Sequence, residues 1–388
     1  MKVLILDFIT SIGGVQSVEY NIIKKLVDKV EMFFLDPYKS SFHEKVSKIN
    51  NLNIVNLYIW PNIKSLNWNI KYFRPIILLV MGPSYVIFLI RLCYFIKKNS
   101  INLLYVNTKK SSLIAFLIKG LLKIDYIYHA HGYNSSKDIS NFYKTVINNS
   151  RSIICVSDSV KETLIERGIN SKKIKTIYNG INVEEIRAKG NENELSMEIS
   201  DKKKIICVAS LHQGKGIHLL IEAFNNIQSE IKDIELIIVG ETPSKIHVSY
   251  KNDLLEMSKK VNKNNIKFIG WTNNPYKYIS KSDVLVLPSI VKESFGMVLV
   301  EAMCLGKIVI GSNIGGIPEV IIDGKTGFLF NCNDVKELEK VLRDTLNNNL
   351  YSTSHAFLEQ YIQEKFTIDN QVEKIYEIII QKKDEKDD

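Results

Sequence analysis

Short apolar runs alternate with longer amphipathic segments along the whole chain. Loops containing Gly or Ser follow the runs, and the segments after these loops carry apolar residues at helical spacing. This pattern is typical of βα units in parallel sheets. The runs predicted as strands are residues 2–8, 102–107, 126–132, 152–157 and 175–180 in the first half, and 204–210, 235–240, 266–270, 284–289 and 307–312 in the second. The sequence therefore predicts two successive α/β sheets.

A polar stretch separates the two groups of strands. Residues 184–203 are rich in charged side chains and poor in strand formers, so we expect a linker there, between a first domain at 1–183 and a second at 204–365. The 388 residues exceed what one hydrophobic core usually supports, which agrees with two domains. We expect a helix at about 366–384 to pack back on the first domain, and the sequence QKKDEKDD to form a frayed tail.

Composition narrows the class of protein. With 45% hydrophobic and 24% charged residues, the chain is neither a disordered protein nor a multispanning membrane protein. The five cysteines lie far apart and form no paired metal-ligand spacing, which favours a reducing, cytoplasmic compartment. The N-terminus MKVLILDF is too short for a signal peptide and is interrupted by Asp7, so it is predicted as a first strand.

The positive charge is concentrated in the first half of the chain. Residues 1–183 contain 25 lysines and arginines against 11 aspartates and glutamates, whereas the rest contains 26 against 31. This asymmetry suggests an anionic partner, either nucleic acid, phospholipid headgroups or a phosphorylated substrate, and the alternative is a merely soluble basic face. Because no nucleic-acid-binding module is recognisable, we expect no nucleic acid as a partner.

The most apolar segment runs from Pro75 to Ile96. A membrane span needs about 20 uninterrupted apolar residues, and this segment is broken by Gly82, Pro83 and Ser84. We therefore expect Ser84 to cap a helix that ends near Lys98, after a loop that packs inside or touches a bilayer surface.

Two places in the first domain follow predicted strands, where ligands of open α/β sheets gather. Gly13 and Gly14 precede an amphipathic helix, so their backbone N–H groups could approach a phosphate, although a glycine turn before a helix is also common. His131, in the sequence His-Ala-His-Gly, could bond a sugar hydroxyl or phosphate oxygen, or be a satisfied core histidine. His129 is predicted to be structural. No third ligand at metal-binding spacing accompanies the two histidines.

In the second domain, Lys215 stands between a strand and a helix. The sequence around it is not a P-loop, because Ala209 and Gly216 occupy positions that need Gly and Ser or Thr. A lysine at a helix N-terminus is unfavourable against the helix dipole unless an anion is near. Lys215 is therefore a candidate diphosphate ligand, and the alternative is a solvated lysine.

The segment Glu293–Glu301, ESFGMVLVE, carries the strongest signal. Glu301 lies in a predicted helix that is otherwise almost wholly apolar, where a carboxylate is costly unless it is hydrogen-bonded, for example by two vicinal hydroxyls such as those of ribose. Glu293 and Ser294 could cap this helix. The N–H groups of Phe295, Gly296, Met297 and Val298 could receive a diphosphate or a sugar hydroxyl.

These motifs closely resemble glycosyltransferase family 4, a group of retaining enzymes with the GT-B fold. The family pattern has two glutamates eight positions apart, as Glu293 and Glu301. The resemblance extends to Gly13-Gly14, His131-Gly132, Val156-Ser157, Tyr178-Asn179-Gly180, Lys215-Gly216, Val239-Gly240, Pro288-Ser289, the run 315–319 and the run 323–327. It implies an α/β structure in which two Rossmann-like, doubly wound parallel-sheet domains face each other across a cleft.

The resemblance also implies roles for these residues. Glu301 would bind the ribose, Lys215 the diphosphate, and Glu293 with the backbone after it the donor hexose. Gly14 would approach the phosphates from the first domain, and His131 would line the donor and acceptor site. Gly13, Ser210 and Gly240 complete the expected donor-binding set. The family commonly has Arg where this chain has Ser210, so the phosphate clamp lacks a fork of donors.

The function implied is transfer of a hexose or N-acetylhexosamine from a nucleotide diphosphate sugar, a UDP-sugar, to a glycan or lipid-linked acceptor. Retention would follow a front-face path in which the departing phosphate oxygen deprotonates the acceptor. No D-x-D motif follows a strand, so no metal and no cofactor are expected. Abundant Ile, Lys and Asn, with the basic first domain, favour bacterial surface polysaccharide synthesis in the cytoplasm, at the inner face of an anionic membrane. The alternative is a catalytically weak GT-B subunit that recognises a protein or glycan partner.

Overall fold

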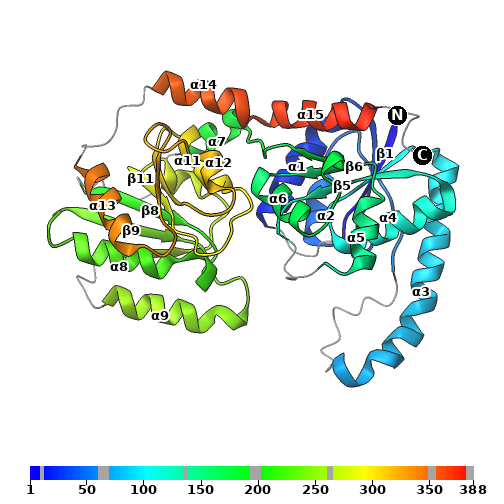
Figure 1. Ribbon diagram of the computed structural model, residues 1–388, viewed down its shortest axis with the longest axis horizontal. Coiled ribbons are helices and arrows are strands. Elements are labelled where there is room, and N and C mark those ends of the chain that lie inside the picture. The colour runs from blue at the N-terminus through cyan, green and yellow to red at the C-terminus, as the bar shows by residue number, and fades with distance from the viewer. Residues whose placement is uncertain are drawn as a thin grey trace. The chain divides into compact units, whose positions relative to one another are not determined.

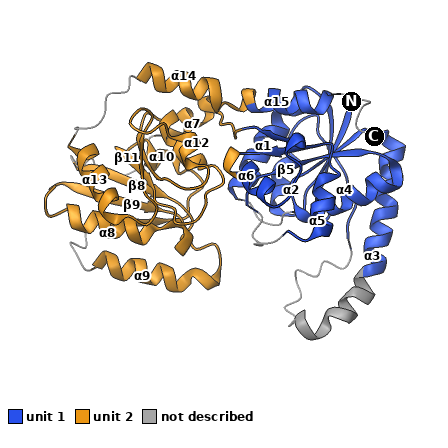
Figure 2. Ribbon diagram, viewed as in Figure 1, with its two compact units in different colours: residues 1–156, 160–177, 371–388 blue, residues 157–159, 178–370 orange. Residues whose placement is uncertain are grey.

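The structure, a computed structural model, describes residues 1–8, 13–59, 70–133, 139–192, 202–259, 265–347 and 355–381, and over 70–81 it describes the backbone alone. The chain divides into two compact units, which are coloured separately in Figure 2. Unit 1 comprises 1–156, 160–177 and 371–388, and unit 2 comprises 157–159 and 178–370. Residues 193–201 of the expected linker and nearly all of the expected tail, at 382–388, lie outside the described residues.

Unit 1 is built on a seven-stranded parallel sheet in the order β3-β2-β1-β4-β5-β6-β7 (Figure 1). Its strands are β1 (Lys2–Leu6), β2 (Glu31–Leu35), β3 (Asn53–Ile54), β4 (Leu103–Val106), β5 (Asp125–Ala130), β6 (Ser152–Cys155) and β7 (Ile174–Thr176). The helices are α1 (Gly14–Leu26), α2 (Ser41–Val46), α3 (Ile70–Asn99), α4 (Lys109–Leu122), α5 (Asn141–Asn148), most of α6 (Asp158–Glu166), the short η2 (Ser171–Lys173) and most of α15 (Ile368–Ile380).

Unit 2 has a six-stranded parallel sheet in the order β10-β9-β8-β11-β12-β13. Its strands are β8 (Lys203–Val208), β9 (Ile234–Val239), β10 (Ile266–Gly270), β11 (Val284–Leu287), β12 (Ile308–Ser312) and β13 (Phe328–Phe330). The helices are α7 (Val183–Gly190), η3 (Gln213–Lys215), α8 (Ile217–Ile227), η4 (Lys245–His247), α9 (Val248–Lys259), α10 (Tyr276–Ile279), α11 (Met297–Cys304), α12 (Ile317–Val320), α13 (Val335–Leu346) and α14 (His355–Lys365). The expected doubly wound parallel-sheet architecture is thus present in both units.

All ten predicted strands are present, and β2, β3 and β13 were not predicted. The chain divides at Ile177, and helix α7 occupies part of the range expected as a linker. The segment from Gln371 onward belongs to unit 1. There, the guanidinium of Arg151 donates to the carbonyls of Ile378 (2.7 Å) and Ile379 (3.0 Å), at the C-terminus of α15.

The prediction that Ser84 caps a helix is wrong, because Ser84 lies inside helix α3. The helix is continuous from Ile70 to Asn99 and passes through Pro83. An internal proline removes one backbone hydrogen bond and costs about 3 kcal/mol. Burial of Phe88, Leu92 and Ile96 against the rest of unit 1 compensates for this loss. No helix within the described ranges has both the length and the apolar character required to cross a membrane.

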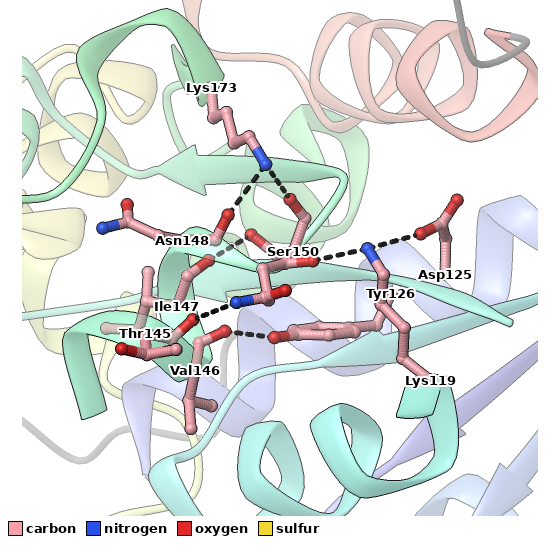
Figure 3. A network of polar contacts seen from close by, with 10 residues as sticks. Lys119, Asp125, Tyr126, Thr145, Val146, Ile147, Asn148, Ser150 and Lys173 are labelled. Atoms are coloured by element: carbon pink, nitrogen blue, oxygen red, sulfur yellow. Dashed lines mark hydrogen bonds and ion pairs between the residues drawn. The ribbon is translucent and has the colours of Figure 1, made fainter. Parts of the chain in front are cut away.

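A polar network holds the C-terminus of α5 at the amino end of β5 and β6 (Figure 3). Lys173 donates to the carbonyls of Asn148 (2.7 Å) and Ser150 (3.2 Å). Lys119 donates to the carbonyl of Asn149 (2.7 Å) and pairs with Asp125 (2.8 Å). Cations satisfy helix-terminal carbonyls and interact favourably with the helix dipole. These two lysines of the basic first half are therefore engaged inside the fold.

The strand order creates one switch point in each sheet, because strands on either side of β1–β4 and of β8–β11 wind in opposite directions. In open parallel sheets, ligands bind beyond the carboxyl ends of the strands at such points. The predicted site residues follow β1 and β5 in unit 1 and β8, β9 and β11 in unit 2.

Candidate active site

Main-chain contacts that only glycine permits join the loops at the switch point of unit 2. Gly216 has φ +63°, and a Cβ there would lie 1.9 Å from the carbonyl oxygen of Pro288, after β11. Gly240, after β9, has φ +142°, and its Cβ would lie 1.9 Å from the carbonyl oxygen of Ala209, after β8. The N–H of Ile290 also donates to the carbonyl of Gly214 (2.9 Å). Three loops are thereby held together at backbone level.

Lys215 and Glu293 form the central ion pair of this site. Nζ of Lys215 lies 2.5 Å from Oε2 of Glu293, and both side chains are about one-fifth exposed. The hydroxyl of Ser289 donates to the same carboxylate oxygen (3.1 Å). The loop after β12 packs against the backbone of Glu293. A Cβ on Gly315 in that loop would lie 2.4 Å from the carbonyl oxygen of Glu293. The anion that Lys215 was predicted to need is therefore Glu293 itself.

Helix α11 starts just beyond this pair. Its N-cap is Gly296, with φ +93° and no side-chain cap, so Glu293 and Ser294 do not cap the helix in the way that their residue types would allow. The helix geometry leaves the N–H groups of Met297 and Val298 without an intrahelical acceptor. Phe295 is buried, and its ring packs against Tyr178 and Phe366, 5.8 Å from each ring centroid. The N–H groups at the N-terminus of α11 can thus bind an anion beside Lys215.

Glu301 lies one turn further along α11. The hydroxyl of Tyr276, on α10, donates to Oε1 of Glu301 at 3.3 Å. Burial raises the pKa of Glu301 to about 7, and the bond from Tyr276 opposes this rise. A carboxylate in this setting gains from further hydrogen-bond donors, as a pair of sugar hydroxyls would supply.

In unit 1, His131 is stacked on His129. The ring centroids are 3.9 Å apart, and Nδ1 of His129 lies 2.5 Å from the hydroxyl of Tyr105, on β4. Burial lowers the pKa of His131 to about 4, and burial and His131 lower that of His129. Both Nε2 atoms are buried, and neither has a hydrogen-bond partner among the described residues. Both imidazoles are therefore neutral near pH 7.

The switch point of unit 1 holds a buried carboxyl group that the sequence analysis missed. Glu19, on α1, accepts a hydrogen bond from the Asn107 side chain (2.5 Å), and burial, followed by the charge of Asp7, raises its pKa. Nearby in sequence, the N–H of Gly13 donates to Oε1 of Gln16 (2.7 Å), whereas a Cβ on Gly14 would meet no atom of the described residues within 4 Å. Of the two glycines, Gly14 is thus the one with open space beside it.

Other residues of the site were also not predicted. Tyr276 contacts Glu301, and His212 and His247 lie in the loops around Lys215. Ser210 is half-buried at the end of β8, and its carbonyl accepts a hydrogen bond from the N–H of His212 (3.0 Å). No sequence motif marks Tyr276 or His247, because each of them reaches the site only through the order of the strands. In the described part of the chain, no three His, Cys, Asp or Glu side chains are grouped to hold a metal ion.

Comparison with known proteins agrees with this geometry. Residues 189–364 match the family described as Glycosyl transferases group 1, and residues 12–185 match Glycosyltransferase Family 4. An uncharacterized glycosyltransferase of Methanocaldococcus jannaschii is 31% identical over 68% of this chain and 71% of the relative. N-acetyl-alpha-D-glucosaminyl L-malate synthase of Bacillus anthracis is 29% identical over 68% and 71%, respectively. Capsular polysaccharide biosynthesis glycosyltransferase CapM of Staphylococcus aureus is 26% identical over 50% and 52%.

The fold is shared with a solved structure of HepE from Anabaena in complex with UDP. The TM-score is 0.80, the identity is 19%, and the match covers 98% of this chain and 99% of that chain. For the curated relatives named above, the matched stretch spans 52% to 71% of their own length. The chain belongs to the family 4, group 1, glycosyltransferases and has their GT-B fold.

Proposed function

We propose that this protein is a retaining glycosyltransferase that moves a hexose or an N-acetylhexosamine from a UDP-sugar to a hydroxyl group of a glycan or lipid-linked acceptor. The observation that carries the proposal is the Lys215–Glu293 ion pair beside the N-terminus of α11, with Glu301 one turn away. Along the donor the hexose comes first, then the diphosphate, then the ribose, and these three groups need a carboxylate, a cation and a second carboxylate, respectively. The UDP and UDP-glucose complexes of HepE support a UDP-linked donor.

The roles assigned to the residues follow from their chemistry. Lys215 and the N–H groups at the start of α11 hold the diphosphate, Glu293 accepts hexose hydroxyls, and Glu301 accepts the ribose hydroxyls. In unit 1, Gly14 is proposed to approach the phosphates, and neutral His131 to contact the donor sugar and the acceptor. The remaining donor-binding candidates are Gly13, Ser210, Gly240, Ser294, Phe295, Gly296, Met297 and Val298.

The proposed step retains the configuration at the anomeric carbon and needs no metal. The bond from the anomeric carbon to the phosphate oxygen breaks, and the acceptor oxygen bonds to the same face of that carbon. The acceptor proton passes to the departing phosphate oxygen. The protein stabilises the charge that develops on the diphosphate and aligns the reactants.

We further propose that the enzyme works in the cytoplasm, at the inner face of a bacterial membrane, in the synthesis of a surface polysaccharide. The relationship to the capsular enzyme CapM supports this setting. Helix α3 supports the membrane contact, because Val86, Ile87, Ile90 and Tyr94 are 52–67% exposed on the face opposite Phe88, Leu92 and Ile96. Lys97 and Lys98 follow this apolar stripe. An apolar stripe that ends in cations fits the surface of an anionic bilayer.

The test is turnover of purified protein with single UDP-sugars and a pool of glycan and lipid-linked acceptors. We expect UDP release that depends on the acceptor, and a product whose mass increases by one hexose or N-acetylhexosamine. Glu301→Ala is the matched variant, and it should raise the apparent donor constant strongly. If the wild-type protein binds nucleotide without turnover, the partner-recognition alternative is correct. If it neither turns over nor binds any nucleotide, the donor site itself is wrongly assigned.

A further inference from the structure

Two histidines lie beside the proposed diphosphate ligand. His212 precedes η3, which ends at Lys215, and His247 ends η4, which follows β9. The centroids of the two rings are 5.6 Å apart, with an angle of 46° between the rings. Both residues are half-buried.

The ring of His212 lies close to the backbone of Gly214. A Cβ on Gly214 would lie 3.1 Å from Cε1 and 3.2 Å from Nδ1 of His212, and 2.9 Å from a methyl carbon of Val291. The missing side chain at Gly214 therefore makes room for the imidazole next to the loop that carries Glu293. The N–H of Lys215 donates to the carbonyl of His212 (3.0 Å), so the imidazole of His212 and the ammonium group of Lys215 belong to the same backbone turn.

Titratable groups from three segments of unit 2 lie around His212. Burial comes first among the causes that lower its pKa, followed by Lys215 and His247, and Glu293 is the one neighbour that raises it. These groups come from η3, from the loop after β9 and from the loop after β11. The carboxylate of Glu293 thus lies near the ammonium group of Lys215 and two imidazoles, which can donate hydrogen bonds to an anion that displaces the carboxylate.

We propose that His212 and His247 are ligands of the donor's diphosphate, so that donor binding becomes tighter as the solution becomes more acidic. This inference rests on the proposed function and deepens it. The two imidazoles supply hydrogen-bond donors next to Ser210, where a guanidinium would otherwise be expected. In their protonated form they make charge-assisted bonds to phosphate oxygens, which are about twice as strong as neutral ones.

The experiment compares the affinity of wild-type protein, His212→Gln and His247→Gln for UDP-glucose and UDP-N-acetylglucosamine between pH 6 and 8. The charge of these diphosphate diesters does not change over this range. The titration of Glu301 is common to all the proteins and cancels in the ratio of variant to wild-type dissociation constants. We expect this ratio to be several-fold at pH 6, below the limit of about tenfold that a pKa rise of about one unit on binding allows, and to fall toward one at pH 8. His355→Gln, in the exposed part of α14, should give a ratio near one throughout.

A ratio that does not vary with pH, in a wild-type protein that binds the donor, overturns this inference and leaves the proposed function intact. Failure of the wild-type protein to bind any nucleotide overturns both. A second measurement does not require the variants to fold. In NMR titrations of wild-type protein, the pKa of His212 should rise with UDP-glucose and stay unchanged with uridine. An equal response to uridine would mean that the rings contact the base, which contradicts a phosphate role.

Discussion

Nζ of Lys215 lies 2.5 Å from Oε2 of Glu293, so the group expected to hold the diphosphate is already paired with the group expected to hold the sugar. A donor that reaches this site competes with Glu293 for the ammonium group and, at the same time, offers hydroxyls to the carboxylate. The pair thus keeps both charges satisfied before and after binding.

Lys215→Ala should weaken UDP-sugar binding by about 10- to 100-fold, as expected for the loss of a hydrogen bond to a charged group. Isothermal titration calorimetry with UDP-glucose measures this change. Lys251→Ala is the control, because Lys251 forms a more exposed ion pair with Glu241 (2.7 Å) in the same unit. Its effect should be less than about threefold. Equal effects of the two substitutions would contradict the role of Lys215.

Glu301→Gln should stabilise the fold at high pH and weaken donor binding. The pKa of Glu301 is about 7 in the folded chain, against an ordinary value of 4.5, because burial disfavours the charge. The folded state therefore holds a proton that the unfolded state releases between these values, and stability falls as pH rises through this window. We expect no change in the free energy of unfolding near pH 4.5 and an increase of about 1–3 kcal/mol at pH 8. Urea unfolding at both pH values checks this, and a pH-independent effect would contradict it.

His131→Gln should lower kcat by about 100-fold or more, as for loss of a group that acts on the reacting atoms, with little change in donor affinity. The same substitution should also change how the free energy of unfolding depends on pH. Because the pKa of His131 is lowered to about 4, the wild-type fold loses stability as pH falls from about 6.5 toward 4. The variant should lose less over this range. His355→Gln is again the control, and matching pH profiles for wild type and His131→Gln would contradict the burial of His131.

Gly216→Ala should destabilise unit 2 by roughly 3 kcal/mol or more, because the new Cβ would overlap the carbonyl oxygen of Pro288. Gly324→Ala is matched in backbone conformation, with φ +70° against +63°, but its Cβ would meet no atom within 4 Å. It should cost only about 1–2 kcal/mol, the price of the left-handed conformation. Thermal unfolding of both variants separates the effect of the Cβ overlap from that of backbone strain. Equal losses of stability would show that the contact between Gly216 and Pro288 is unimportant.

Replacing Ile87 and Ile90 by Ser should weaken binding to phosphatidylglycerol vesicles by about tenfold or more, since each exposed isoleucine contributes apolar area to the contact. Cosedimentation measures this binding. Ile246→Ser, at an 84% exposed isoleucine in unit 2, should have no effect. Vesicle binding that is absent in wild type, or unchanged in the double variant, would remove α3 from the membrane contact.

The sequence could predict those elements whose pattern is local. The ten predicted strands are apolar runs followed by Gly or Ser loops, whereas β2 follows α1 with no such punctuation, and β3 and β13 have only two and three residues. Helix α3 was predicted too short, because Gly82 and Pro83 normally end a helix and packing of its C-terminal half overrides that tendency.

The same distinction applies to the candidate site. Lys215, Glu293 and Glu301 could be found because a charge next to a helix terminus or inside an apolar helix has a cost that needs an explanation. Tyr276, His247 and Glu19 could not, because each comes close to its partner only through the order of strands in the sheet.

The glycine contacts among the loops of unit 2 also have a practical meaning. Since backbone contacts help to hold these loops together, the side chains proposed to contact the donor can be exchanged without rebuilding the scaffold. An engineer who wants a different sugar donor should keep Gly216, Gly240 and Gly315 and randomise positions such as 210, 212 and 247. We expect most members of such a library to fold, so that they differ mainly in substrate preference.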